Sequence, residues 1–435
     1  MTAAQRLSGN KRERRFKPYP AYKDSGVEWL GGIPADWELK AVKRVAKLRA
    51  GTAITAESIQ EVGEFPVFGG NGIRGFNSSY THDGRFPLIG RQGALCGCVS
   101  FASGKFWASE HAVVAASQTG IDPAWLAFLL CAMTLNDFSQ SAAQPGLAVE
   151  TISALRVPVP RISEQRAIAA FLDRETARID ALVAKKERLI ELLQEKRRAL
   201  ITRAVTKGLD PNAPKKDSGV NWLGQIPAHW EVKRLWHLTP SARRIMYGIV
   251  LPGPNVDDGV PIIKGGDVSP ERLRLDRLSR TTFEIESGYV RSRVRGGDLV
   301  YAIRGSIGEA AMIPLELEGA NLTQDAARVA YTPATHGPWL LQALRSVAVF
   351  AQLEAGALGA TIRGINIRDL KRASIPVPPR DEQRGIANLL EREMGKIDTL
   401  VSKVQDAIDH LKELRTALIS AAVTGKIDVR PSETA

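Results

Sequence analysis

The residues of this chain with the most distinctive chemistry are three cysteines, and zinc binding is the first role they suggest. Cys96, Cys98 and Cys131, with a histidine such as His111, would supply the thiolate and imidazole ligands that zinc prefers. The Cys-x-Cys pair, however, alternates within ALCGCVSF, a stretch typical of a half-buried strand. We therefore interpret the cysteines as small core residues and expect no metal. Their odd, small number also argues against a disulfide framework.

A second pattern with chemical meaning is the glycine-rich string GNGIRG at residues 70–75, which matches the dinucleotide-binding fingerprint. No helical pattern follows it, as a βαβ unit would require. Asn-Gly pairs are also typical of hairpin turns. We therefore interpret this string as a turn.

Signatures of catalysis are missing from the sequence. It contains no methyltransferase motif of the Asn/Asp-Pro-Pro-aromatic type, no G-x-x-x-x-G-K-[ST] phosphate loop and no H-E-x-x-H metal helix. It also contains no Pro-Asp…Glu-x-Lys nuclease set, and its six histidines form no triad with a serine in a G-x-S-x-G turn. We therefore expect a chain that is not an enzyme and that binds no cofactor or metal of its own.

The bulk composition favours a basic, soluble protein. The 435 residues are 44% hydrophobic and carry a formal net charge of +12, which suits about two to four domains. An excess of Lys and Arg favours a polyanionic partner, with nucleic acid first and an acidic membrane surface second. A basic protein without such a partner is the alternative. No apolar run is long enough to span a bilayer and no secretory signal begins the chain, so we expect a cytoplasmic location.

The sequence is built from two internal repeats. Residues 24–40 and 217–233 share 13 of 17 positions, and residues 157–208 and 375–426 share 26 of 52 without a gap. The order is therefore short repeat, variable region, long repeat, and then the same again. The variable stretches, about 41–145 and 234–363, share little sequence with each other. This arrangement indicates one scaffold that presents two different readers.

The long repeats predict two long helices. The last proline before each predicted helix is Pro160 in the first repeat and Pro379 in the second. Ser163 and Asp381 then follow as natural N-caps of the two helices. Each helix can then run for about 45 residues, and its apolar positions step by four and three, the period of a coiled-coil seam. We expect the two helices to pair within the chain, with an antiparallel arrangement favoured. A self-dimerising coiled coil is the alternative.

The variable regions contain short apolar runs broken by Gly, Asn and Asp, a texture that predicts α+β domains with hairpins. Their turns carry side chains able to bond base edges in the major groove. The candidate DNA-binding residues are Asn71, Arg74, Asn77, Arg91 and Gln92 in the first region, and Lys264, Arg304, Asn321, Gln324 and Arg328 in the second. Arg91 and Arg304 look equivalent, because each ends an apolar strand. Any of these side chains could instead contact a phosphate, form a salt bridge or be solvated.

The predicted fold class is α+β: two globular target-recognition domains separated by a pair of long helices. We expect a flexible basic arm at 1–20, a first domain at 21–156 and a first spacer helix at 157–208. A linker at 209–216, a second domain at 217–374, a second helix at 375–428 and a tail at 429–435 complete the chain.

These motifs resemble those of specificity subunits of type I restriction–modification enzymes, over about residues 20–428. The resemblance rests on W-L-G-x-I-P-x-x-W, at Trp29–Trp37 and Trp222–Trp230, and on I/V-P-V-P…E-Q-R-x-I-A, at 157–169 and 375–387. It implies two domains that each read half of a split, asymmetric DNA site, held apart by helices that act as a ruler. From their chemistry, the four tryptophans at the ends of the short motifs are expected to pack at the junctions of domain and helix.

The resemblance also implies partners. Two methylation subunits would bind the helix pair, and two motor–nuclease subunits would join them for restriction. S-adenosylmethionine, ATP and Mg would belong to these partners. The basic arm, with Lys11, Arg12, Arg14, Arg15 and Lys17, would touch DNA phosphates or form a disordered tail.

Three other readings remain open at this stage. The chain could be an enzyme with an unrecognised catalytic part, or a coiled-coil adaptor that binds only protein. It could also serve a system whose methylation and cleavage subunits are fused. Activity of the purified chain, a sequence-dependent DNA shift and the neighbouring genes would separate these readings.

Overall fold

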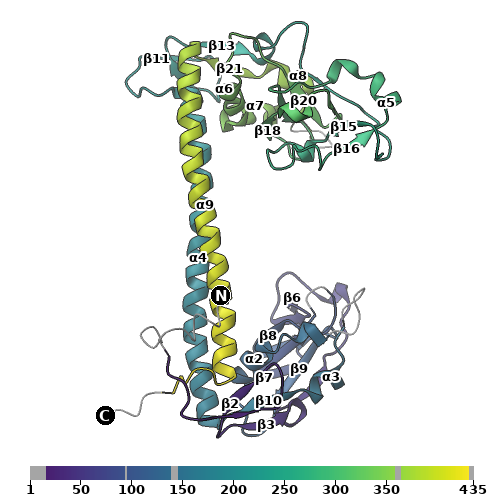
Figure 1. Ribbon diagram of the computed structural model, residues 1–435, viewed down its shortest axis with the longest axis vertical. Coiled ribbons are helices and arrows are strands. Elements are labelled where there is room, and N and C mark those ends of the chain that lie inside the picture. Colours follow the sequence, from purple (N-terminus) through teal and green to yellow (C-terminus); the bar gives the residue numbers. More distant parts are fainter. Residues whose placement is uncertain (1–15, 94–95, 139–145, 358–363, 431–435) are drawn as a thin grey trace. The chain divides into compact units, whose positions relative to one another are not determined.

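The computed structural model describes residues 16–93, 96–138, 146–357 and 364–430. The chain divides into two compact units (Figure 1): unit 1 comprises Met1–Glu187 and Gln405–Ala435, and unit 2 comprises Arg188–Val404. Each unit holds one globular domain, one part of helix α4 (Ile162–Lys207) and one part of helix α9 (Arg380–Val423). The tandem organisation predicted from the repeats is therefore present.

The domain of unit 1 is built on a six-stranded sheet in the order β4-β9-β7-β8-β5-β6. The strands are β4 (Ala46–Ala50), β5 (Phe65–Gly69), β6 (Gly72–Asn77), β7 (His82–Gly90), β8 (Val99–Ala108) and β9 (Ala112–Ser117). Neighbours are antiparallel except β5 and β8, which are parallel. Smaller helices follow the chain at η1 (Val42–Arg44), η2 (Ala56–Ser58), α2 (Pro123–Ala132), η3 (Leu135–Phe138) and α3 (Val149–Ala154).

Successive side chains along these strands point to opposite faces of the sheet, and both faces are apolar. Ile89 of β7 and Val113 of β9 pack into a core that includes Trp125 of α2. Their neighbours Leu88 and Val114 face a second cluster on the other side of the sheet. Asp122 begins α2, because its carboxylate accepts hydrogen bonds from two backbone N–H groups of the first turn, each at 3.0 Å.

The domain of unit 2 contains a four-stranded sheet, β14-β20-β17-β18, and a three-stranded sheet, β16-β15-β19. The strands are β14 (Met246–Tyr247), β15 (Val260–Ile263), β16 (Ser279–Thr281), β17 (Leu299–Ala302), β18 (Ala310–Met312), β19 (Asn321–Leu322) and β20 (Ala326–Val329). The helices are η4 (Leu235–Leu238), η5 (Gly265–Asp267), α5 (Phe283–Ser287), η6 (Val290–Ser292), η7 (Leu315–Leu317), α6 (Gly337–Arg345), α7 (Val347–Ala357) and α8 (Ile367–Arg372).

Short strand pairs join each domain to its helices. In unit 1, β1 (Tyr22–Asp24) pairs with β2 (Gly32–Pro34), and β3 (Glu38–Ala41) pairs with β10 (Arg156–Val159). In unit 2, β11 (Lys215–Asp217) pairs with β12 (Gln225–Pro227), and β13 (Glu231–Arg234) pairs with β21 (Ser374–Val377). The strand that enters each domain therefore lies beside the strand that leaves it, just before the long helix begins.

The long helices are shorter than the predicted ranges. Residues 156–159 and 374–377 form strands, so α4 begins at Ile162 and α9 at Arg380. Ser163 and Asp381, predicted as N-caps, lie in the first turn instead. The reason is that the N–H groups of Gln165 and Gln383 already bond the carbonyls of Arg161 and Pro379, at 2.9 and 3.0 Å.

The two helices pair in antiparallel fashion within each unit. In unit 1, Arg415 of α9 donates to Asp180 of α4 at 2.9 and 3.3 Å. In unit 2, Arg197 of α4 forms an ion pair with Asp398 of α9. The repeat alignment matches Asp180 with Asp398 and Arg197 with Arg415. The same ion pair therefore forms twice, with the arginine on α9 in unit 1 and on α4 in unit 2, as in an isologous contact. The intramolecular antiparallel pair predicted from the two seams is confirmed.

The predicted seam is only partly buried. Ile168 and Leu172 of α4 and Ile386 and Leu390 of α9 are fully buried against the domains. Four leucines that belong to the apolar period of the two helices are instead exposed: Leu182 (47%), Leu189 (43%), Leu400 (49%) and Leu414 (40%). A pair of helices buries only a narrow stripe on each partner, so apolar residues at the edge of a wider stripe stay in contact with solvent.

The start of the described chain packs onto unit 1, although residues 16–20 were predicted to be part of a flexible arm. The ring of Phe16 meets Phe171 edge-on at 5.5 Å, and Tyr19 is 4% exposed with its hydroxyl donating to Glu164 at 2.7 Å. The Lys17 carbonyl accepts from the N–H of Asp428 at 2.7 Å. The other basic residues of the predicted arm, at positions 11, 12, 14 and 15, lie outside the described residues.

Candidate nucleic-acid interface

The two domains share one backbone frame despite their dissimilar sequences. Strand β5 (FPVFG) pairs in parallel with β8 at Val67–Trp107, and β15 (VPII) pairs in parallel with β19 at Ile262–Asn321. Strand β7 pairs with β9 at Gly90–Ala112, and β17 pairs with β20 at Ala302–Ala326. These registers align the domains residue by residue, so positions in one can be compared with positions in the other.

Three loop segments converge in each domain. A Cβ added at Gly70 would lie 3.5 Å from the His111 carbonyl and 3.6 Å from the Gln92 carbonyl. A Cβ added at the equivalent Gly265 would lie 2.1 Å from the carbonyl of Arg304 and 3.0 Å from that of Asp325. Only glycine fits at Gly265, because the obstructing atoms belong to the backbone. The turn after β5 or β15 therefore sits against the residues that follow β7 or β17.

The two arginines that look equivalent in sequence occupy different places in this frame. The Leu147 N–H bonds the Arg91 carbonyl at 3.0 Å, and the Ile365 N–H bonds the Ile303 carbonyl at 2.8 Å. Because Leu147 and Ile365 are matching residues of the long repeat, Arg91 corresponds to Ile303. Arg304 therefore corresponds to Gln92, and the predicted match of Arg91 with Arg304 is wrong by one residue.

In the first domain the loop cluster presents three exposed polar side chains. Asn71 lies at the β5–β6 turn, Arg74 on β6 and Gln92 after β7. The Arg74 side chain crosses the turn, because its Cδ would lie 2.3 Å from a Cβ added at Gly69. Arg91 is half-buried beside them. Four of the five candidates predicted in this domain are thus brought together.

In the second domain the corresponding cluster contains Lys264, Arg304 and Gln324. Lys264 is exposed, and its ammonium donates to the Ser279 hydroxyl at 2.9 Å. Arg304 is exposed, and Gln324 is half-buried with its N–H bonded to the Ile249 carbonyl at 2.9 Å. Three of the five candidates predicted here lie at the loop cluster.

The remaining three candidates are structural, and their prediction as base readers is contradicted by their contacts. Asn77 is 9% exposed, with its amide donating to the Ser58 carbonyl at 3.1 Å. Asn321 is fully buried, and its amide donates to Glu286 at 2.9 Å and to the Tyr289 carbonyl at 3.0 Å. A buried amide with its bonds satisfied has no edge left for a base.

Arg328 is the third of these residues. It is 3% exposed, and one of its Nη atoms donates to the carbonyls of Arg291 and Arg293, both at 2.7 Å. Burial, with the nearby Arg243, lowers the pKa of its guanidinium. The hydrogen bonds fasten β20 to the segment around η6, so this arginine holds the domain together.

The repeated tryptophans differ in burial. Trp37 and Trp230 are fully buried and pack in the cores that include the ends of α9 and α4, respectively. Trp29 is half-buried against the same core as Trp37. Trp222, expected to pack in the same way, is 47% exposed, so it does not serve as a packing anchor in this chain.

Sequence reasoning missed a pair of buried glutamines at the junctions. Gln165 is 1% exposed, and its side-chain amide donates to the Pro160 carbonyl at 2.9 Å. Its side-chain oxygen accepts a hydrogen bond from the N–H of Asp122, the N-cap of α2, at 2.8 Å. Gln383 makes the same pair of bonds, to the Pro378 carbonyl and from the N–H of His336, at 2.9 and 2.8 Å. Each glutamine ties a long helix to its domain. The E-Q-R string, which occurs in both long repeats, is the sequence signal that could have pointed to these two glutamines.

The cysteines show no arrangement for metal binding within the part of the chain that the structure describes. There, no group of three or more His, Cys, Asp or Glu residues is placed to hold a metal ion. Cys96 is buried and its thiol donates to the Arg91 carbonyl at 3.2 Å. Cys98 and Cys131 are exposed, so the interpretation as core residues is correct for Cys96 only. The GNGIRG string forms the β5–β6 turn and part of β6.

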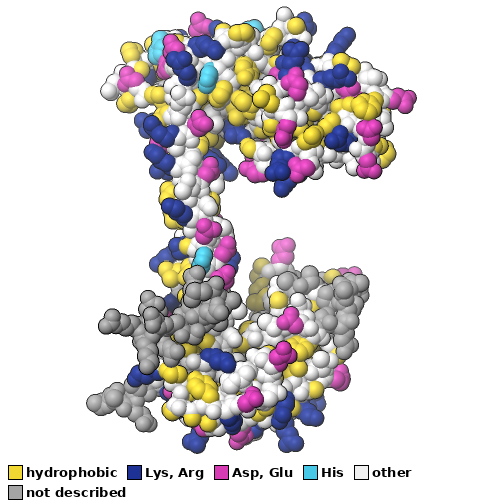
Figure 2. Space-filling model, viewed as in Figure 1, with side chains coloured by type: hydrophobic (Ala, Val, Ile, Leu, Met, Phe, Trp, Pro, Cys, Tyr) yellow, Lys and Arg dark blue, Asp and Glu magenta, His cyan; other side chains and the backbone are white. Residues whose placement is uncertain are grey.

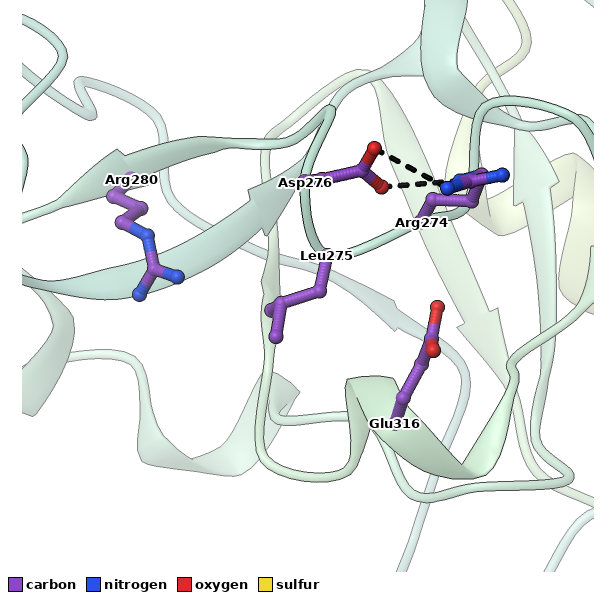
Figure 3. Close-up of a pocket in the computed structure, with 5 residues that line it drawn as sticks. All are labelled: Arg274, Leu275, Asp276, Arg280 and Glu316. Carbon is purple, nitrogen blue, oxygen red and sulfur yellow. Dashed lines mark hydrogen bonds and ion pairs between the residues drawn. The ribbon is translucent and has the colours of Figure 1, made fainter.

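An open hollow of 770 Å³ in unit 2 is lined by Arg274, Leu275, Asp276, Arg280 and Glu316 (Figure 3). Arg274 donates to Asp276 at 3.0 and 3.3 Å. This contact raises the pKa of the arginine and lowers that of the aspartate. Acid–base catalysis needs pKa values moved toward neutrality. The ion pair moves the pKa values of Arg274 and Asp276 away from neutrality, so neither of these two residues is tuned as a catalytic acid or base.

Surface charge is distributed over both units. Figure 2 shows Lys and Arg side chains interspersed with Asp and Glu on the globular domains and on the helices. No helix among the described residues is long and apolar enough to cross a membrane.

Comparison with known proteins shows which proteins the chain is similar to. Residues 34–192 match the family model described as the type I restriction modification DNA specificity domain. The chain is similar to the EcoprrI specificity subunit of a type I restriction enzyme from Escherichia coli, with 43% identity over 164 residues, 37% of this chain and 41% of that protein. It is also similar to the EcoBI specificity subunit from the same species, with 26% identity over 67% of this chain and 63% of that protein. The alignments thus span less than two thirds of either relative.

A solved structure from a study of complex assembly and conformational transition of the type I R-M system has the same fold. Its TM-score is 0.66 at 16% identity, and the match covers 90% of this chain and 98% of that one. Over residues 34–192 the chain is therefore similar to the type I restriction modification DNA specificity domain, and the relatives it matches are named as specificity subunits of type I restriction enzymes.

Proposed function

We propose that this chain is the DNA-recognition subunit of a type I restriction–modification complex and that it reads a bipartite, asymmetric site. One observation carries the proposal: the same β frame occurs twice, with different side chains at equivalent exposed positions, such as Gln92 against Arg304. Side chains of these types bond base edges in the major groove. Two unlike readers in one chain require two unlike half-sites.

The energetics of recognition favour such a design. A mismatch costs each small domain only about 1–3 kcal/mol, so one domain alone discriminates weakly. Linking the domains makes the second binding event intramolecular, and the combined site is then read with much greater specificity. The paired helices α4 and α9 act as the spacer that fixes the gap between half-sites.

The partners follow from the family and from the exposed leucines. Leu182 and Leu400 are equivalent in the long repeats, and they are 47% and 49% exposed, one in each unit. Equivalent apolar surfaces suit two copies of one partner, and we assign them to two methylation subunits. Two motor–nuclease subunits join for ATP-dependent cleavage. S-adenosylmethionine, ATP and Mg are held by these partners, and the complex acts in the cytoplasm.

The chain itself catalyses no step in this proposal, and a reconstitution tests that directly. Purified chain and the methylation subunit of a neighbouring gene are mixed with DNA and labelled S-adenosylmethionine, together and separately. Methyl transfer to adenine is expected only from the mixture. Transfer by the chain alone would make it an enzyme, and equal transfer by the methylation subunit alone would remove its recognition role.

A further inference from the structure

We infer that Gln92 and Arg304 read equivalent steps of the two half-sites, adenine in the first and guanine in the second. The inference rests on the proposed function and adds to it the residue in each domain that specifies one base. It follows from the shared backbone frame, from the freedom of the two side chains and from the glycines around them.

The two residues occupy the same backbone position. Each follows the residue whose carbonyl accepts from Leu147 or Ile365 of the long repeat, at 3.0 and 2.8 Å. Each is followed by a glycine in the left-handed region, Gly93 with φ of 86° and Gly305 with φ of 72°. Side chains that leave equivalent backbone positions in equivalent loops point into equivalent surroundings.

Among the described residues, no hydrogen bond or ion pair engages either of these two side chains, and both are exposed. Four of the other candidates are committed elsewhere. Lys264 bonds Ser279 at 2.9 Å, and Asn77, Asn321 and Arg328 are buried within the fold. Gln92 and Arg304 therefore remain available to a ligand at the centre of each loop cluster.

Glycines lie beside Gln92 and Arg304 and leave space around these two side chains. Gly70 and Gly265 themselves carry no side chain and lie against the carbonyls of Gln92 and Arg304. A Cβ added at Gly93 would meet nothing within 4 Å. Glycines let the backbone approach a ligand closely, so a base edge can reach the long polar side chain that lies beside them.

The base assignment follows from hydrogen-bonding capacity. The Gln amide carries one donor and one acceptor and matches the N6 and N7 edge of adenine, whereas the Arg guanidinium has only donors and matches O6 and N7 of guanine. One bidentate contact of this kind changes base preference roughly 5- to 150-fold. The half-sites are therefore expected to differ at this step in a defined way.

The test exchanges the two side chains in the methylating complex and maps methylated adenines by single-molecule sequencing. Gln92→Arg should change one adenine of the first half-site to guanine, and Arg304→Gln should change one guanine of the second half-site to adenine. Gln60→Arg and Arg368→Gln make the same changes of side chain at exposed positions of the same two domains. Both should leave the motif as in the wild type.

An unchanged motif in both exchange variants, or a preference lost across a whole half-site, would overturn the inference and leave the proposed function standing. If an exchange prevents assembly, Gln92→Ala and Arg304→Ala replace it, and each should relax a single base position. A wild-type complex without a split motif would count against the proposed function instead, so the two failures are distinguishable.

Discussion

Polar residues in the two domains divide into those that hold the fold and those that face outward. Asn321 lies at the centre of a buried network, where its amide and Arg293 both donate to the Glu286 carboxylate. The Ser292 hydroxyl donates to the Asn321 oxygen at 2.7 Å. Each buried polar atom is satisfied by another, so the network fixes the segment between α5 and β19 rather than any ligand.

Replacing Arg328 should destabilise unit 2 without any direct effect on base recognition. Arg328→Met removes the donors for three backbone carbonyls, those of Arg291, Arg293 and Arg244, from the buried position of Arg328. We expect a loss of about 3 kcal/mol in the stability of unit 2, because buried polar groups without partners are costly. Amide exchange of β17 and β20 measures it. Arg304→Met, an exposed matched variant, should change exchange by less than about 0.5 kcal/mol; an equal loss in both variants would contradict the structural role of Arg328.

Glu286 should make the stability of unit 2 depend on pH. Its hydrogen bond with Arg293 holds the pKa of the carboxyl below its usual value. A lowered pKa in the folded state gives stability that is complete above the unfolded value of about 4.3 and is lost as the pH falls through the folded value. Glu286→Gln should be less stable at neutral pH by about 2 kcal/mol.

The same variant should also lose less stability than the wild type on acidification. Denaturant unfolding followed at pH 7 and pH 3 compares the two proteins. An equal loss of stability between pH 7 and pH 3 in the wild type and in Glu286→Gln would show that other carboxylates cause the acid destabilisation.

Residue types and spacing indicated the loop clusters but not which candidates reach the surface. Asn321 and Arg328 have the chemistry of base readers, and their burial depends on η6 and on the α5 segment, which are distant in sequence. Arg91 and Arg304 seemed equivalent because each ends an apolar strand. Only the backbone bonds to Leu147 and Ile365 reveal the one-residue shift.

At the scale of elements, the repeated sequence determined the architecture well. The prolines and the long apolar period predicted both helices and their pairing, because these are local signals. The predicted starts of the two long helices were less accurate, because the residues there form β10 and β21. These strands pair with β3 and β13, which lie more than 100 residues earlier in the sequence. The exposed leucines were not predicted, because an apolar stripe does not reveal how much of it a single partner helix covers.

Those leucines give a prediction about partner binding. Leu182→Gln with Leu400→Gln should leave the thermal unfolding of the chain unchanged within about 2 °C, because exposed side chains contribute little to stability. Affinity for the methylation subunit should fall at least about 10-fold, since apolar contact area is lost. Leu390→Gln, at a position 1% exposed, is the contrasting variant and should destabilise the chain. Unchanged binding by the double variant would exclude this surface.

At the scale of the whole molecule, the helix pair should act as a spacer between the two half-sites. One heptad added after Leu189 in α4 and one after Gln405 in α9 lengthens both helices by about 10.5 Å. A base-pair step rises about 3.4 Å, so the gap between half-sites should grow by about three base pairs while both half-sites keep their sequence. Methylation mapping of this variant measures the gap, and an unchanged gap would contradict the spacer role.

The measurement that tests the central claim most directly is a genome-wide map of methylated adenines in cells that express this chain with its neighbouring methylation subunit. Two unlike readers in one chain predict a single split motif, with two different half-sites around a fixed gap. A contiguous motif, or two identical half-sites, would contradict the account.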